Sequence, residues 1–169
     1  MKYLLDTCLI SELVKRKPNP AVVSWLDEQD EQKLFLSVLN LGELQKGISK
    51  LADGPKKDEL QAWVGLDLVE RFVGRILDVD LETALCWGKL LGAAEQAGEK
   101  LPVMDSLIAA TAAAHGLVVV TRNVKDMERC GARVCNPWGD PVNSIVDISS
   151  SGRKHTARDH DAVLYGKKP

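Results

Sequence analysis

Four acidic residues border the apolar runs of this chain and are of the right type to bind a divalent cation together. In chain order they are Asp6, Glu43, Asp105 and Asp126. Carboxylates gathered without basic partners would repel one another, and a bound divalent cation is the usual way to stabilise them. Oxygen ligands without histidine or cysteine favour magnesium or manganese over zinc. The acids therefore predict a Mg²⁺ or Mn²⁺ site, whose chemistry would be metal-assisted hydrolysis.

Each acid also has an ordinary structural explanation. Asp105 could cap the helix that it begins, and Asn40 with Glu43 three residues later has the spacing of a capping box. Asp126 could be a solvated loop acid. Asp6 is harder to explain in this way, because it ends an apolar strand where an unpaired carboxylate would be costly to bury. The site hypothesis therefore requires a fold that brings the acids together.

The elements expected to position these acids alternate between strands and helices. Strands are predicted at 2–5, 34–38, 75–79, 117–121 and 132–135, and helices at 8–15, from 19 onwards, at 40–51, at 58–72 as one or two helices, at 81–98 and at 106–115. The run 117–120 is continuously apolar, which is typical of a central parallel strand. The alternation indicates an α/β fold with a doubly wound parallel sheet and helices on both faces. Ligands bind such sheets beyond the carboxyl ends of the strands, where the acids lie.

Composition indicates an ordinary globular chain. The 169 residues are 45% hydrophobic and 27% charged, which fits a single domain with a substantial core. No apolar run approaches the roughly 20 residues that cross a bilayer, so we expect no membrane association and a cytoplasmic protein. Four scattered cysteines without a C-x-x-C pair favour reduced, packed thiols. The formal net charge of −2 leaves any contact with nucleic acid to local basic patches.

The sequence changes character near its end. The segment from Ser149 to Pro169 begins with three serines and a glycine. It then carries five basic residues and two aspartates, which give it a formal charge of +3. We expect a domain at 1–148 followed by a flexible basic tail at 149–169. The apolar group 162–165 in that tail could dock on a partner.

Five short motifs occur in an order and at separations that resemble one family. They are Leu4-Leu5-Asp6-Thr7, Leu41-Gly42-Glu43-Leu44, Asp105-Ser106-Leu107-Ile108-Ala109-Ala110-Thr111-Ala112, Thr121-Arg122-Asn123 and Asn136-Pro137-Trp138. Together they are similar to the PIN-domain toxins of the VapBC type, including the FitB-like branch. The resemblance implies a PIN-like fold, a homodimer and cleavage of single-stranded RNA with Mg²⁺ or Mn²⁺. It also implies inhibition by a cognate antitoxin, with DNA reached only through that antitoxin.

The resemblance also assigns roles to residues. Three acids that define the family site correspond to Asp6, Glu43 and Asp105. A fourth acid stands either directly after the Thr-Arg pair or three positions later, and this chain has Asn123 at the first place and Asp126 at the second. We therefore assign Asp126 as the fourth acid and a metal ligand, and Asn123 as an orienting or water-binding partner.

Three further residues beside the acids are candidates for the site. Thr7 could hold an acid or a phosphate through its hydroxyl, although a threonine at a strand end is more often a local hydrogen-bonding group. Arg122 and Lys125 lie beside the acids in the chain and are predicted to contact the RNA substrate. Trp138 could stack on a base, but tryptophans in such positions more often belong to a core or an interface.

Two functions of other classes also fit acids at strand ends of a doubly wound sheet. One is a receiver-like phosphoacceptor module, against which count the missing pair of adjacent N-terminal acids and the missing lysine after a late strand. The other is an aspartyl-nucleophile phosphatase, which would carry an acid two positions after its nucleophile. Cys8 occupies that position after Asp6.

Overall fold

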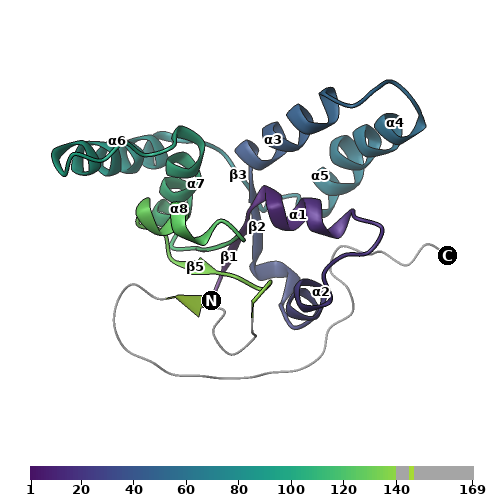
Figure 1. The fold of residues 1–169 in the computed structure, drawn as a ribbon, viewed down its shortest axis with the longest axis horizontal. Helices are drawn as coiled ribbons and strands as arrows, with labels where there is room; N and C mark the ends of the chain where they lie inside the picture. The colour runs from purple at the N-terminus through teal and green to yellow at the C-terminus, as the bar shows by residue number, and fades with distance from the viewer. Residues whose placement is uncertain (140–144, 147–169) are drawn as a thin grey trace.

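A mixed sheet forms the centre of the fold (Figure 1). The computed structural model describes residues 1–139 and 145–146, and within them the sheet has the order β3-β2-β1-β4-β5-β6. The strands are β1 (Tyr3–Leu5), β2 (Leu34–Ser37), β3 (Ile76–Leu77), β4 (Val118–Val120), β5 (Val134–Cys135) and β6 (Ile145–Val146). The first five pair in parallel, and β6 is antiparallel to β5.

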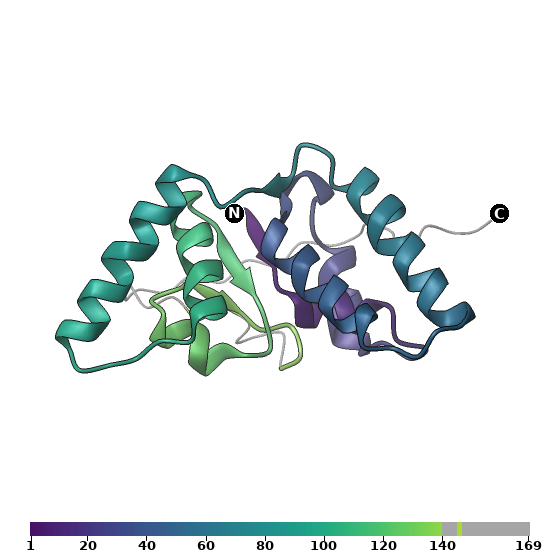
Figure 2. The ribbon, with the colours of Figure 1, turned by 90° about the horizontal axis from the view of Figure 1, so that it is seen from above.

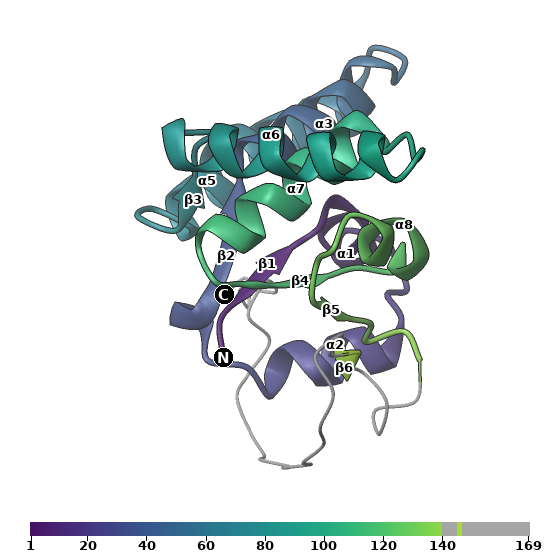
Figure 3. The same cartoon turned by 90° about the vertical axis from the view of Figure 1, so that its left-hand side faces the viewer.

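The strand order reverses between β1 and β4. From β1 the chain builds outwards through β2 and β3, then returns to place β4 on the other side of β1 and continues to β5. Figure 3 shows β2, β1, β4 and β5 following one another across the sheet. The register pairs Leu5 with Val120, so β1 and β4 end side by side. Such a reversal is where open α/β sheets bind their ligands.

Helices cover both faces of the sheet, as the alternating sequence predicts (Figure 2). One face carries α1 (Thr7–Leu13), α2 (Pro20–Asp27), α3 (Val38–Ser49), α4 (Pro55–Ala62), η2 (Trp63–Leu68) and α5 (Val69–Arg71). The other carries α6 (Leu81–Gln96), α7 (Val103–Ala114) and α8 (Val124–Arg129). A short 3₁₀ helix, η1 (Glu31–Lys33), precedes β2.

Alternation along the central strands produces two hydrophobic cores. Tyr3 and Leu5 face the core beneath α1–α3, whereas Leu4 faces the core beneath α6–α8. In β4, Val118 and Val120 likewise face the first core and Val119 faces the second. Each central strand is therefore buried on both sides, which explains why 117–120 is continuously apolar.

Several helix boundaries differ from the predicted ones. Ser37, not Asn40, is the N-cap of α3, and the capping box joins Ser37 to Asn40 rather than Asn40 to Glu43. Helix α7 begins at Val103, two residues before Asp105, because Pro102 holds the extended conformation of an N-cap. The expected helix at 58–72 begins at Pro55 and contains a π-helical turn at η2. Gly116, with φ of 65°, follows the end of α7 as predicted.

Other expectations concern the cysteines, membranes and the tail. None of the four cysteines forms a disulfide within the described residues, and Cys130 and Cys135 are buried. In the part of the chain that the structure describes, no helix has the length and apolar character needed to cross a bilayer. The predicted domain boundary at 148 and the tail at 149–169 lie outside the described residues.

Candidate active site

Asp6 lies at the reversal point of the sheet and is held by hydrogen bonds on both carboxylate oxygens. It directly follows β1 and is the N-cap of α1, where its Oδ1 accepts a 2.8 Å hydrogen bond from the Thr7 backbone N–H. Its Oδ2 accepts a 2.7 Å hydrogen bond from the hydroxyl of Thr121, the residue that follows β4. The side chain is only 7% exposed, so these donors stabilise a charge that burial would otherwise penalise.

Glu43 joins Asp6 through Thr7. The Thr7 hydroxyl donates a 2.6 Å hydrogen bond to Glu43 Oε2 and accepts one of 3.2 Å from Asn40 Nδ2. Asn40 is fully buried and fixed in turn, because its Oδ1 accepts the Ser37 backbone N–H at 2.9 Å. Thr7 therefore connects two of the predicted acids, and the capping-box explanation of Glu43 is wrong.

Asp105 lies in the first turn of α7, where the charges of the other acids act on it. Its side chain makes no capping hydrogen bond, so the structure does not support the cap explanation. Burial is the largest cause that raises the pKa of Asp105, and the charges of Asp126, Asp6 and Glu43 raise it further. The four predicted acids thus act on one another electrostatically at Asp105.

Asn123 and Thr121 complete a connection from Asp105 back to Asp6. Asn123 Nδ2 donates to Asp105 Oδ2 at 3.5 Å, at the long end of hydrogen-bond distances, and the Asn123 backbone N–H donates to Thr121 Oγ1 at 2.9 Å. A chain of hydrogen bonds therefore runs from Glu43 through Thr7, Asp6, Thr121 and Asn123 to Asp105, and we call it the carboxylate network.

Asp126 stands apart from that network. It lies in the first turn of α8, and its Oδ1 is 3.7 Å from Arg129 Nη1. The expectation that all four acids lack basic partners is thus wrong for Asp126, because Arg129 follows it at the i,i+3 spacing of a helix. Its charge is nevertheless among the causes that raise the pKa of Asp105.

Sequence reasoning missed three residues that hold the acids. Thr121 and Asn40 are completely buried, and each has a polar side chain at the end of an apolar strand or at the start of the next helix. Cys8 Sγ donates to Asp6 Oδ2 at 3.3 Å and accepts the Arg122 backbone N–H at 3.3 Å. Burial and the neighbouring charge of Asp6 raise the pKa of Cys8 to about 11, so the thiol stays protonated and can donate.

The chemistry of these side chains suits a hard divalent cation. The acids offer only oxygen donors, and a cation would relieve the repulsion that raises the pKa of Asp105. Within the described part of the chain, no group of three or more His, Cys, Asp or Glu side chains is arranged to hold an ion as it stands. Glu43 and Asp105 are partly exposed and can turn, whereas Asp6 is fixed. The oxygen-only donor set therefore fits such an ion.

The predicted substrate cations lie on the exposed rim. Arg122 follows Thr121 directly, and its guanidinium carbon is 5.6 Å from the centre of the Trp138 ring. Lys125 is exposed in the first turn of α8. Both therefore lie on the segment that follows β4, next to the carboxylate network.

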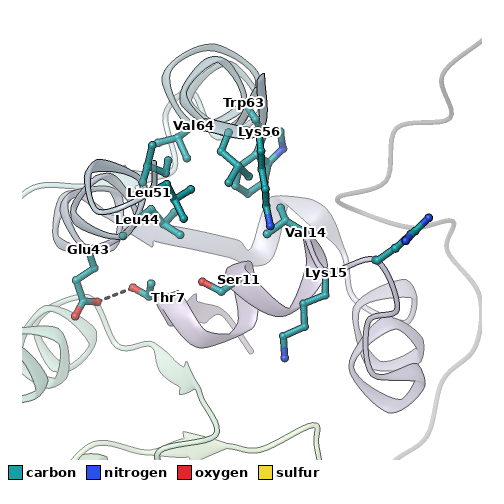
Figure 4. A pocket seen from close by; sticks show the side chains of 14 residues that line it. Thr7, Ser11, Val14, Lys15, Glu43, Leu44, Leu51, Lys56, Trp63 and Val64 are labelled. Atoms are coloured by element: carbon teal, nitrogen blue, oxygen red, sulfur yellow. Dashed lines mark hydrogen bonds between the residues drawn. The ribbon is translucent and has the colours of Figure 1, made fainter. Parts of the chain in front are cut away.

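A largely apolar groove of about 490 Å³ begins at Glu43 and Thr7 (Figure 4). We call it the α1–α3–α4 groove. Its walls are Val14 of the residues after α1, Leu44, Ile48 and Leu51 of α3 and its end, and Leu60, Trp63 and Val64 of α4 and η2. Lys15, Arg16 and Lys56 form its basic rim, and Glu43 is its only acidic lining residue among those described.

Comparison with known proteins agrees with this arrangement. A family model described as PIN domain matches residues 3–131. VapC ribonuclease Y4jK of Sinorhizobium fredii is 35% identical over 135 residues, which are 80% of this chain and 96% of that protein. Toxin FitB of Neisseria gonorrhoeae is 36% identical over 137 residues, 81% of this chain and 99% of that protein. The solved structure of FitAB bound to an IR36 DNA fragment aligns with a TM-score of 0.77 at 33% identity, covering 83% of this chain and 99% of that chain.

Proposed function

The chain belongs to the PIN-domain family, and from that premise we propose that it is an endoribonuclease, the toxin of a toxin–antitoxin pair. The observation that carries the proposal is the carboxylate network, which ties acids from distant segments together at the reversal point of the sheet. A relative named as a ribonuclease and one named as a toxin match over most of their length. The reaction is hydrolysis of an RNA phosphodiester bond.

Asp6, Glu43, Asp105 and Asp126 are the residues that would hold Mg²⁺ or Mn²⁺. When bound, such an ion supplies a water of lowered pKa and a positive charge against the scissile phosphate. Thr7 and Thr121 fix Asp6 through its two oxygens, so that this ligand would need no reorganisation when the ion binds. Asn123 orients Asp105 from the opposite side of the network.

Arg122 and Lys125 are the residues that would bind the RNA backbone. The chain as a whole is weakly acidic, so these exposed cations provide local attraction for phosphate beside the acids. The position of Arg122 one residue after Thr121 places its contact close to the carboxylate network.

The proposed partner is a cognate antitoxin, and DNA is reached only through it. The FitAB structure is a complex on a DNA fragment, and the α1–α3–α4 groove supplies a surface for such a partner in this chain. Its apolar walls would bury an apolar segment, its basic rim would attract acidic flanks, and Glu43 at one end would attract a cation (Figure 4). An antitoxin segment seated there would cover the approach to Glu43. A homodimer and a place in the cytoplasm remain predictions.

The proposal is tested by incubating the purified protein with a mixed pool of single-stranded RNA, with Mg²⁺, with Mn²⁺ and with chelator. We expect internal cleavage that depends on the metal and stops when the antitoxin is added. A parallel incubation with acetyl phosphate tests the two alternative functions, because a receiver-like module would become phosphorylated and a phosphatase would hydrolyse the compound. Acetyl phosphate turnover without RNA cleavage would refute the ribonuclease proposal.

A further inference from the structure

Arg122 lies where the active site meets a tryptophan near the end of the described domain. Its backbone N–H donates to Cys8 Sγ at 3.3 Å, which fixes the main chain next to Asp6. Its side chain is exposed, and the guanidinium carbon lies 5.6 Å from the centre of the Trp138 ring. A guanidinium at this distance over an indole face is attracted by the ring, most strongly when the ring is tryptophan.

Trp138 is itself fixed from three sides. Its backbone N–H donates to Asn136 Oδ1 at 3.0 Å, and its ring packs against the core beneath α1–α3. The indole Nε1 donates to Glu12 Oε2 at 3.4 Å. The ring is therefore oriented by its own turn, by the core and by a carboxylate of α1.

Glu12 is a buried acid that the proposed hydrolysis does not use. It is 5% exposed and accepts hydrogen bonds from Lys15 Nζ at 2.7 Å and from the Asn19 backbone N–H at 2.9 Å. The Lys15 hydrogen bond is the main cause that lowers the pKa of Glu12, so the side chain is a carboxylate at neutral pH. A buried carboxylate with several donors is a firm anchor for the indole N–H.

We propose that Trp138, anchored by Glu12, is a positioning residue that holds the Arg122 guanidinium at the rim of the active site to receive an RNA phosphate. This inference rests on the proposed ribonuclease function. An arginine spread over a ring loses less conformational freedom on binding than one that moves freely in solvent. The same geometry argues against base stacking on Trp138, because Arg122 covers one ring face and Glu12 holds the ring edge.

Steady-state cleavage kinetics test the proposal on the full chain. W138L removes the ring and should raise KM about two- to fivefold, the range set by an exposed cation–π contact, with kcat within about twofold of wild type. W138F keeps a ring face but loses the Nε1–H that Glu12 accepts, so its KM should lie between the values of wild type and W138L. R122Q should raise KM at least as much as W138L, and the double variant W138L/R122Q should be no worse than R122Q alone.

Matched controls distinguish a rise in KM caused by losing the Trp138–Arg122 contact from one caused by a lost charge or a damaged core. R133Q removes an equal charge from an exposed arginine that contacts the Gly116 carbonyl instead of a ring. W25L removes another half-buried tryptophan, which packs on Tyr3. Both should leave KM unchanged. Additive effects in W138L/R122Q would overturn the proposal and identify Trp138 as a direct RNA contact, and an unchanged KM in W138L would overturn it outright.

A second measurement does not depend on cleavage. In ¹H–¹⁵N spectra of the full chain, the ring current of Trp138 should shift the Arg122 Hε resonance upfield, and W138L should move it to the position of a freely mobile arginine. E12Q should reduce the shift. If W138L leaves the resonance in place, Trp138 does not position Arg122. If the shift behaves as expected but wild-type protein cleaves no RNA, the proposed function fails while the positioning of Arg122 stands.

Discussion

The Thr121 hydroxyl donates a 2.7 Å hydrogen bond to Asp6 Oδ2 across 115 positions of sequence. The contact exists because β1 and β4 are neighbours in the sheet and end together, with Leu5 opposite Val120. Since the Asn123 backbone N–H donates to the same hydroxyl oxygen and the Asn123 side chain also reaches Asp105, this hydroxyl links Asp6 to the part of the carboxylate network that contains Asp105.

Thr121→Val should impair both cleavage and stability. The substitution keeps the shape but leaves Asp6 Oδ2 without its shortest hydrogen bond, so we expect about 10- to 100-fold slower cleavage, typical for partners of metal ligands. The Asp6 oxygen keeps only the longer hydrogen bond from Cys8, so the free energy of unfolding should also fall by roughly 1–3 kcal/mol. Thr111→Val is the matched control, because that buried hydroxyl donates only to the Leu107 carbonyl within α7. Equal losses of activity in both variants would contradict a specific role for Thr121.

The fourth site member can be decided by comparing Asp126 with Asn123. Asp126→Asn should lower the affinity for activating Mg²⁺, because it removes a negative charge that acts on Asp105. Asn123→Ala should lower activity less, since Asn123 contacts Asp105 only at 3.5 Å. The measurement is cleavage rate against Mg²⁺ concentration. If Asp126→Asn activates at the wild-type concentration and Asn123→Ala does not, our assignment of these two residues is reversed.

Asp105 should make the metal-free protein less stable as pH rises. Burial and its acidic neighbours raise its pKa in the folded state, so the folded chain keeps a proton that the unfolded chain has lost. The free energy of unfolding should therefore fall as pH rises from the usual Asp pKa to above the raised one. Asp105→Asn should melt higher than wild type in chelator at neutral pH, and Mg²⁺ should raise the melting temperature of wild type more than that of the variant.

Asp6→Asn should differ from Asp105→Asn in the same melting experiment. Asp6 Oδ1 and Oδ2 accept hydrogen bonds from Thr7 and Thr121, and an asparagine can accept with only one of its two terminal atoms. We therefore expect no stabilisation in chelator from Asp6→Asn. A higher melting temperature for Asp6→Asn than for Asp105→Asn would show that repulsion, not hydrogen bonding, dominates at Asp6.

Trp63→Ala should separate antitoxin binding from catalysis. Trp63 lines the α1–α3–α4 groove away from the carboxylate network, and a buried aromatic anchor commonly contributes a factor of about ten or more to affinity. Antitoxin affinity measured by calorimetry should fall while RNA cleavage by the free toxin stays near wild type. Trp25→Ala serves as the control, because Trp25 packs on Tyr3 outside the groove. Unchanged affinity in Trp63→Ala would place the partner elsewhere.

The first five strands and most of the helices were predictable because they depend on local periodicity, but α8 was not predicted. Continuous apolar runs and the Asn19-Pro20 helix start are local signals, and the structure confirms helices on both faces of a sheet whose first five strands are parallel, whereas the antiparallel β6 was not predicted. The start of α3 could not be predicted, since Ser37 and Asn40 are both common capping residues and only the fold decides which of them is the N-cap. The Asp126–Arg129 pair, by contrast, has i,i+3 spacing that the sequence alone displays.

The acids of the site were predictable in type, but their connections were not. Asp6, Glu43 and Asp105 stand out because they border apolar runs in the sequence. Thr121 gains its role only through the contact of β1 with β4, and Asn40 only through its contact with Thr7, 33 positions away. Such non-local contacts follow from strand order, which periodicity does not fix.

The most direct test of the account is the cleavage rate of Asp105→Asn in saturating Mg²⁺ under single-turnover conditions. Asp67→Asn, which neutralises an exposed aspartate of η2, is the matched control. If Asp105 is a ligand of the catalytic ion, Asp105→Asn should cleave a single-stranded RNA at least about 100-fold more slowly than wild type, with an unchanged fold by circular dichroism, and Asp67→Asn should cleave at the wild-type rate. Cleavage by Asp105→Asn at the wild-type rate, in protein free of host nuclease, would contradict the assignment of the carboxylate network as the active site.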